Sequence, residues 1–215
     1  MGFQLYSPDE LTKKEKYDRQ RFFNEVLQEG KTEKSQGKRL AIIGEPGAGE
    51  TTLLQKIGDW VFGEANELAI WVSLTAVGEL SLRDYLLEVW LRDVGETLLP
   101  PSPERQKDFA EFLASGKVWL LLDGIDETSV SMSLSQIASQ LKSLTSKLRV
   151  VVSCRLNVWD ADKNALFNFD TYRSLEFGYP DEVGRFIDKW FAGVPENAER
   201  LKQQLEESGK DGSAI

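Results

Sequence analysis

Short apolar runs and stretches with helical spacing follow one another along most of the 215 residues. Runs of consecutive Val, Ile and Leu predict buried strands, and apolar residues three and four positions apart predict helices. We expect strands at 38–44, 68–75, 117–123, 148–155 and, more briefly, 172–177. Helices are expected between them at 51–62, 81–94, 101–115, 133–146 and 180–191. Such alternation is typical of a mainly parallel sheet of about five strands with helices on both faces.

The two ends of the chain have a different pattern. Residues 8–29 are rich in helix formers, with Leu11, Phe22 and Val26 available for an apolar stripe, and residues 31–38 form a polar connector. Residues 196–208 predict one more helix near the C-terminus. The sequence therefore predicts an α/β fold that is preceded by an N-terminal helix.

Composition narrows the possible functions. The chain has 26 Lys and Arg against 35 Asp and Glu, a net charge of −9, so we expect no direct nucleic-acid ligand. It has no histidine, which excludes His-based metal sites, Ser-His triads and Cys-His dyads. A single cysteine and no secretory leader predict a cytoplasmic protein. The apolar runs are too short to span a bilayer, so we expect no membrane partner.

The first predicted strand is followed by a glycine-rich stretch. Residues 44–52 read GEPGAGETT: Gly44, Glu45, Pro46, Gly47, Ala48, Gly49, Glu50, Thr51 and Thr52. They match the phosphate-loop pattern G-x-x-x-x-G-K-[ST] except that Glu50 takes the lysine position. The backbone N–H groups of such a loop cradle phosphates, while the Thr51 hydroxyl would hold Mg²⁺ and Thr52 would contact the α-phosphate. The alternative is a tight strand-to-helix turn without a ligand.

Polar residues also follow two later strands. The run LLLDGIDE places Asp123 where it would hold the water shell of Mg²⁺, and Asp126 or Glu127 where it would orient or deprotonate an attacking water. The alternative is a solvated acidic loop. The run VVVSCR brings Ser153 and Arg155 to the same edge, where Arg155 would sense the γ-phosphate or simply neutralise the acidic pair. The alternation predicts that Cys154 packs in the core.

Together, GEPGAGET, LLLDGIDE and VVVSCR resemble the NACHT family of P-loop NTPases, in the STAND class of signalling proteins, in a bacterial NLR-like form. The small residue after the first aspartate and the acidic pair in DGIDE distinguish this family from other P-loop proteins. The run YRSLEFGYPDEVGRFIDKWF is similar to the strand and helix that close the family's nucleotide domain. The resemblance covers about residues 38–192.

The resemblance implies a three-layer P-loop NTPase that acts as a switch in innate-immunity-like signalling. Such a switch is inactive with ADP and competent to assemble with ATP, with Mg²⁺ as its cofactor. It implies a helical lead-in over residues 1–37, a nucleotide-binding domain over 38–193 and the start of a following helical region over 194–215. The family's later helical and winged-helix parts supply a lid proline and a histidine, so we expect the chain to be part of a longer protein. Protein partners or self-assembly are expected to use those further regions.

The acidic residue at position 50 changes the expected state of the site. At about 4 Å and an effective dielectric near 20, one unit charge pair is worth roughly 4 kcal/mol. A net penalty of about 3 kcal/mol would weaken phosphate binding more than a hundredfold, so the nucleotide is expected to bind weakly or not at all. Glu50 is an engineered change, a natural degeneration of the site, or a sign that the loop binds differently, for example through a divalent ion.

Three functions are compatible with these motifs and with Glu50. The first is the ATP/ADP-binding domain of a NACHT-type switch ATPase whose binding and turnover are impaired by Glu50. The second is a pseudo-NTPase that acts as a protein-interaction scaffold. The third, a P-loop kinase for a small metabolite, is disfavoured because the DGIDE acids point to water as the acceptor and because the sequence has no arginine-rich lid segment.

Overall fold

A computed structural model of the chain describes residues 5–6, 15–125, 133–162, 164–174 and 181–211. The chain divides into two compact units, Gly2–Leu175 and Glu176–Ile215. The first contains the sheet and the second contains a pair of helices, and each is described separately below. The predicted domain boundaries after residues 37 and 193 stay predictions.

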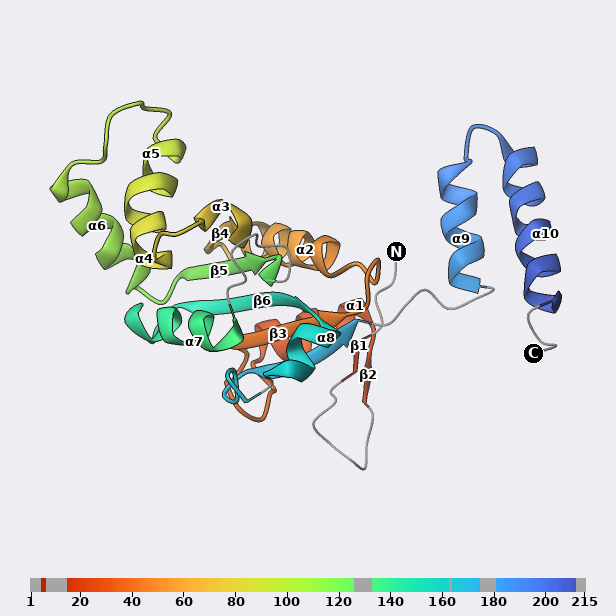
Figure 1. Cartoon of the computed structure of the whole chain (residues 1–215), viewed down its shortest axis with the longest axis horizontal. Coiled ribbons are helices and arrows are strands. Elements are labelled where there is room, and N and C mark those ends of the chain that lie inside the picture. The colour runs from red at the N-terminus through yellow and green to blue at the C-terminus, as the bar shows by residue number, and fades with distance from the viewer. Residues whose placement is uncertain (1–4, 7–14, 126–132, 163, 175–180, 212–215) are drawn as a thin grey trace. The chain divides into compact units, whose positions relative to one another are not determined.

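The first unit is built on a seven-stranded sheet with the order β2-β1-β7-β3-β6-β5-β4 (Figure 1). The five strands from β7 to β4 run parallel, which confirms the predicted α/β fold. Two short strands, which the sequence analysis missed, extend the β7 edge in antiparallel pairing. The strands are β1 Leu5–Tyr6, β2 Lys16–Tyr17, β3 Arg39–Gly44, β4 Leu68–Ser73, β5 Val118–Asp123, β6 Arg149–Arg155 and β7 Asp170–Ser174.

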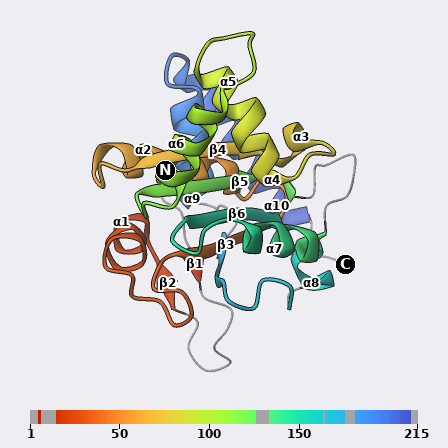
Figure 2. The ribbon, with the colours of Figure 1, turned by 90° about the vertical axis from the view of Figure 1, so that its left-hand side faces the viewer.

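Helices cover both faces of this sheet. In Figure 2, α1 and α2 lie on one side of the stacked strands and α7 and α8 lie on the other. The helices are α1 Arg19–Arg21, η1 Phe22–Gln28, α2 Glu50–Gly63, α3 Leu74–Val77, α4 Leu82–Asp84, η2 Tyr85–Trp90, α5 Leu91–Val94, α6 Pro103–Leu113, α7 Leu134–Ser143 and α8 Leu156–Ala161. The segments η1 and η2 are π-helical turns that continue α1 and α4.

Two apolar clusters form the core, one on each face of the sheet. Ile42 and Val151 face the cluster beneath η1 and α2, whereas their neighbours Ile43 and Val152 face the cluster beneath η2, α6 and α7. This alternation is the period-two pattern of strands buried on both faces. Together, the sheet and its two helix layers give the three-layer arrangement expected of a P-loop fold.

The N-terminal helix is shorter than the predicted span of residues 8–29. Lys16 and Tyr17 form β2, and the helix begins only after Asp18, whose side chain accepts a hydrogen bond from Arg21 N at 2.8 Å. The aspartate N-cap therefore sets the start of the helix. The aromatic rings of Phe22 and Tyr172 meet edge to face at 5.0 Å and join this helix to β7.

The second unit consists of α9 (Asp181–Trp190) and α10 (Pro195–Asp211). Ile187 of α9 and Ala198 of α10 are its buried apolar residues in the part of the chain that the structure describes. Lys202 Nζ pairs with Asp188 Oδ1 at 2.5 Å and so adds an ionic link between the two helices.

Candidate nucleotide site

The turn between β3 and α2 has a backbone that glycine makes possible. Gly47 and Gly49 have φ angles of +86° and +88°, which side chains beyond glycine rarely adopt. Ala48 N donates to Glu45 O at 3.0 Å, and α2 begins at Glu50 with Gly49 as its N-cap. The chain thus turns sharply and points the N-terminus of a fourteen-residue helix toward the edge of the sheet. That end of a helix attracts anions through its N–H groups and dipole.

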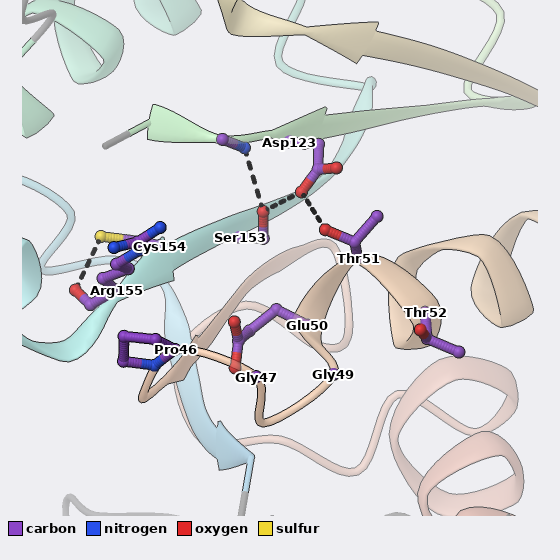
Figure 3. A pocket seen from close by; sticks show the side chains of 11 residues that line it. Pro46, Gly47, Gly49, Glu50, Thr51, Thr52, Asp123, Ser153, Cys154 and Arg155 are labelled. Atoms are coloured by element: carbon purple, nitrogen blue, oxygen red, sulfur yellow. Dashed lines mark hydrogen bonds between the residues drawn. The ribbon is translucent and has the colours of Figure 1, made fainter. Parts of the chain in front are cut away.

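A pocket of about 350 Å³ opens in front of this helix end (Figure 3). It brings the glycine-rich stretch together with the ends of β5 and β6, as the sequence predicted. The strand order explains this, because β6 lies between β3 and β5 and all three carboxyl ends meet at one edge. The lining residues are Pro46, Gly47, Gly49, Glu50, Thr51, Thr52, Asp123, Gly124, Ser153, Cys154 and Arg155.

Hydroxyl groups hold the Asp123 carboxylate in place. Thr51 donates to Asp123 Oδ1 at 3.3 Å, and Ser153 donates to the same oxygen at 2.5 Å. Ser153 Oγ also accepts a hydrogen bond from Gly124 N at 3.2 Å. Ser153 therefore links the strand end of β5 to β6 and orients the aspartate toward α2.

The pair formed by Thr51 and Asp123 suits Mg²⁺. Two adjacent oxygen ligands of an octahedral Mg²⁺ are about 3 Å apart, close to the 3.3 Å between these two atoms. No group of three or more His, Cys, Asp or Glu that could hold a metal occurs among the described residues. Thr51 and Asp123 could hold Mg²⁺ together with waters and phosphate oxygens, as is usual for this ion.

Glu50 folds back over its own loop. A Cβ atom placed on Gly44 would lie 1.9 Å from Glu50 Oε1 and 2.8 Å from Glu50 Cδ. The oxygen Oε1 is buried. Figure 3 shows the carboxylate pointing toward Pro46 and Gly47 and away from Asp123. The acid therefore lies within the loop, and Gly44 leaves the room that it fills.

This geometry agrees with the comparison to protein families. A family model described as the NB-ARC domain matches residues 19–171. The chain belongs to the NB-ARC domain family. It is thus a nucleotide-binding domain of the signalling-type P-loop ATPases in the STAND class. The finer resemblance to the NACHT family is not tested by this match.

Solved structures give weaker likenesses to this NB-ARC domain. A chain from the structure of Drosophila ORC bound to GC-rich DNA and Cdc6 matches with 12% identity and a TM-score of 0.44, covering 91% of this chain and 71% of that one. A chain from Drosophila ORC bound to AT-rich DNA and Cdc6 gives 15% identity and a TM-score of 0.43, covering 91% and 75%. No curated protein matches the sequence. Among the described residues, no helix is long and apolar enough to cross a membrane.

The remaining residues predicted for the NB-ARC site lie at the pocket, in the core or outside the described part of the chain. Arg155 lines the pocket with an exposed side chain at the end of β6. Cys154 is buried in a core cluster, as predicted. Asp126 and Glu127 lie outside the described residues, so their roles in orienting water stay predictions, as does the role of Arg155 as a sensor.

Three residues of the glycine-rich stretch do not line the pocket. Gly44 and Ala48 are buried behind the loop, and Glu45 pairs with Arg173 of β7 at 3.6 Å. Ala48 O accepts a buried hydrogen bond from Ser174 Oγ at 2.6 Å. The end of β7 thus anchors the loop at two points, which the sequence analysis missed because nothing local marks β7 as the neighbour of β3.

Proposed function

We propose that this NB-ARC domain is the ATP/ADP-binding part of a STAND switch with a NACHT-like site, in which Glu50 impairs nucleotide binding and turnover. The pocket in which the loop, Asp123 and Arg155 meet is the observation that carries the proposal. The DGIDE run favours the NACHT-like variant because it offers carboxylates beyond the Mg²⁺ ligand. The single cysteine favours a cytoplasmic location.

Each part of the site has a task in this proposal. The N–H groups around Gly47 and Gly49 would bind the β-phosphate, and Thr51 with Asp123 would hold Mg²⁺. Bound Mg²⁺ neutralises phosphate charge. Asp126 or Glu127 would orient the attacking water, and Arg155 would contact the γ-phosphate.

One substitution tests this function. Glu50→Lys replaces repulsion by attraction, and we expect it to tighten Mg-ATP binding more than a hundredfold in calorimetry, for a change of about 3 kcal/mol or more. Glu64→Lys makes the same charge change at the C-cap of α2 and is the matched control. If Glu50→Lys binds Mg-ATP no better than the parent, the role given to the charge at position 50 is wrong.

A second function is favoured by one observation. Because the Glu50 carboxylate lies inside the loop, the parent chain also fits a pseudo-NTPase that scaffolds other proteins without turnover. Release of inorganic phosphate from Mg-ATP by the purified parent chain would rule this out. The absence of release from the parent, together with release from Glu50→Lys, would support it.

A further inference from the structure

The Glu50 carboxylate lies inside the turn between β3 and α2. The side chain begins at the first residue of α2, on the rim of an open pocket, yet its Oε1 atom is buried. It comes so close to Gly44 that a single added carbon there would lie 1.9 Å from this oxygen. This oxygen of the carboxylate is therefore inserted into the turn, and the carboxylate points away from Asp123 (Figure 3).

The turn around this carboxylate is built to attract anions. Gly47 and Gly49 both have left-handed φ angles, which turn successive N–H groups toward the inside of the loop, and the helix N-terminus adds positive potential. A carboxylate carries the same sign of charge as a phosphate, so the same positive potential attracts it. The loop thus favours the Glu50 side chain for the reason that it favours a nucleotide.

We propose that Glu50 is an internal anion that occupies the phosphate position of the loop, so that any nucleotide must displace it. This inference rests on the proposed nucleotide-binding function and goes beyond it, because charge repulsion alone requires no occupancy. An internal ligand acts at an effective concentration on the order of millimolar or higher, since it is held by a short tether. Nucleotide binding to the parent chain is then a competition between two anions for one loop.

Repulsion and occupancy predict different effects of side-chain length. Glu50→Asp keeps the charge and the favourable place in the first helical turn but is one methylene shorter, so its carboxylate cannot reach as far into the loop. Glu50→Gln keeps the length and removes the charge, and Glu50→Ala removes both. If repulsion acts alone, Glu50→Asp has the same nucleotide affinity as the parent, and Glu50→Gln has the same affinity as Glu50→Ala. If the side chain occupies the loop, Glu50→Asp binds nucleotide more tightly than the parent, and Glu50→Ala binds it more tightly than Glu50→Gln.

The test measures the affinity of the parent and the three variants, each with all 215 residues, for pyrophosphate without metal and for Mg-ADP by calorimetry. We expect Glu50→Ala to bind roughly tenfold tighter than the parent or more, with Glu50→Asp about threefold tighter than the parent. Thermal unfolding by circular dichroism confirms that each variant is folded. The proposal is overturned if Glu50→Asp has the same affinity as the parent and Glu50→Gln has the same affinity as Glu50→Ala.

A second readout follows the loop directly. In ¹H–¹⁵N spectra of the parent chain, the Gly47 and Gly49 amides should move on Glu50→Ala, and pyrophosphate should then shift them back toward their positions in the parent. Unchanged glycine amides in Glu50→Ala would contradict occupancy. If neither Glu50→Ala nor Glu50→Lys binds Mg-ADP, the nucleotide-binding function itself fails, and this outcome is distinct from failure of the occupancy alone.

Discussion

At the scale of single residues, the position of Asp123 depends on a side chain from another strand. The sequence alone predicts Asp123 as a candidate Mg²⁺ ligand because it ends an apolar strand, but the orientation of its carboxylate depends on Ser153, which approaches from another strand. The Ser153 hydroxyl donates to the Asp123 carboxylate and accepts from Gly124 N. It therefore binds both the side chain of the aspartate and the backbone of the residue that follows it. Residues that orient a metal ligand commonly affect metal affinity nearly as strongly as the ligand does.

We therefore expect Ser153→Ala to weaken Mg²⁺ binding. Made in the Glu50→Lys protein, it should raise the Mg²⁺ concentration needed for half-maximal ADP binding by about 10- to 100-fold, because Asp123 loses the shorter of its two hydrogen bonds from hydroxyl groups. Metal-free ADP affinity should change little. Ser135→Ala is the matched control, since Ser135 also donates to an aspartate, Asp162, on an exposed surface. Equal Mg²⁺ dependence in Ser153→Ala and Ser135→Ala would rule out the positioning role of Ser153.

At the scale of elements, β7 is the support of the phosphate loop. It lies next to β3, and its last residue donates a buried hydrogen bond from Ser174 Oγ to Ala48 O. The preceding Arg173 pairs with Glu45 at the start of the same loop. Ser174, which comes 126 residues after Ala48 in the chain, thus supports the loop through a buried hydrogen bond.

Removing this support should cost stability. Ser174→Ala leaves the buried Ala48 carbonyl without its donor, and we expect the free energy of unfolding to fall by about 1–3 kcal/mol. Ser143→Ala is the control, because Ser143 Oγ donates to Gln140 O over the same 2.6 Å but at an exposed site, where we expect a change within about 0.5 kcal/mol. Urea denaturation measures both. Equal losses in the two variants would mean that the Ser174 bond has no special role.

The elements also show what the sequence can and cannot predict. The five parallel strands and the phosphate loop were predictable, because continuous apolar runs and glycine spacing are local signals. The hairpin of β1 and β2 was not, because strands of two residues are too short for any periodicity. The contacts of Ser174 and Arg173 depend on strand order, which is a non-local property. The inward fold of Glu50 depends on the room above Gly44, which only the assembled loop reveals.

At the scale of the whole molecule, the two units differ in how much apolar surface they bury. Both core clusters draw all of their members from residues 17–172. In the second unit, Ile187 and Ala198 are the buried apolar residues among those described, while Trp190 and Val194 are 72% and 50% exposed. A helix pair of about 40 residues buries too little surface for a stable fold of its own without other support.

We expect this difference to appear in native-state hydrogen exchange. The amides of α9 and α10 should exchange through local openings of low free energy, because few apolar contacts oppose the separation of the two helices. The amides of β3, β5 and β6 should exchange only with global unfolding, since these strands are buried on both faces. Peptides from α2 are the internal control, because this helix is similar in length to α10 but packs four buried side chains against the sheet. If peptides from α9 are protected as strongly as those from β5, the C-terminal helices unfold together with the nucleotide domain and are not a separate unit of stability.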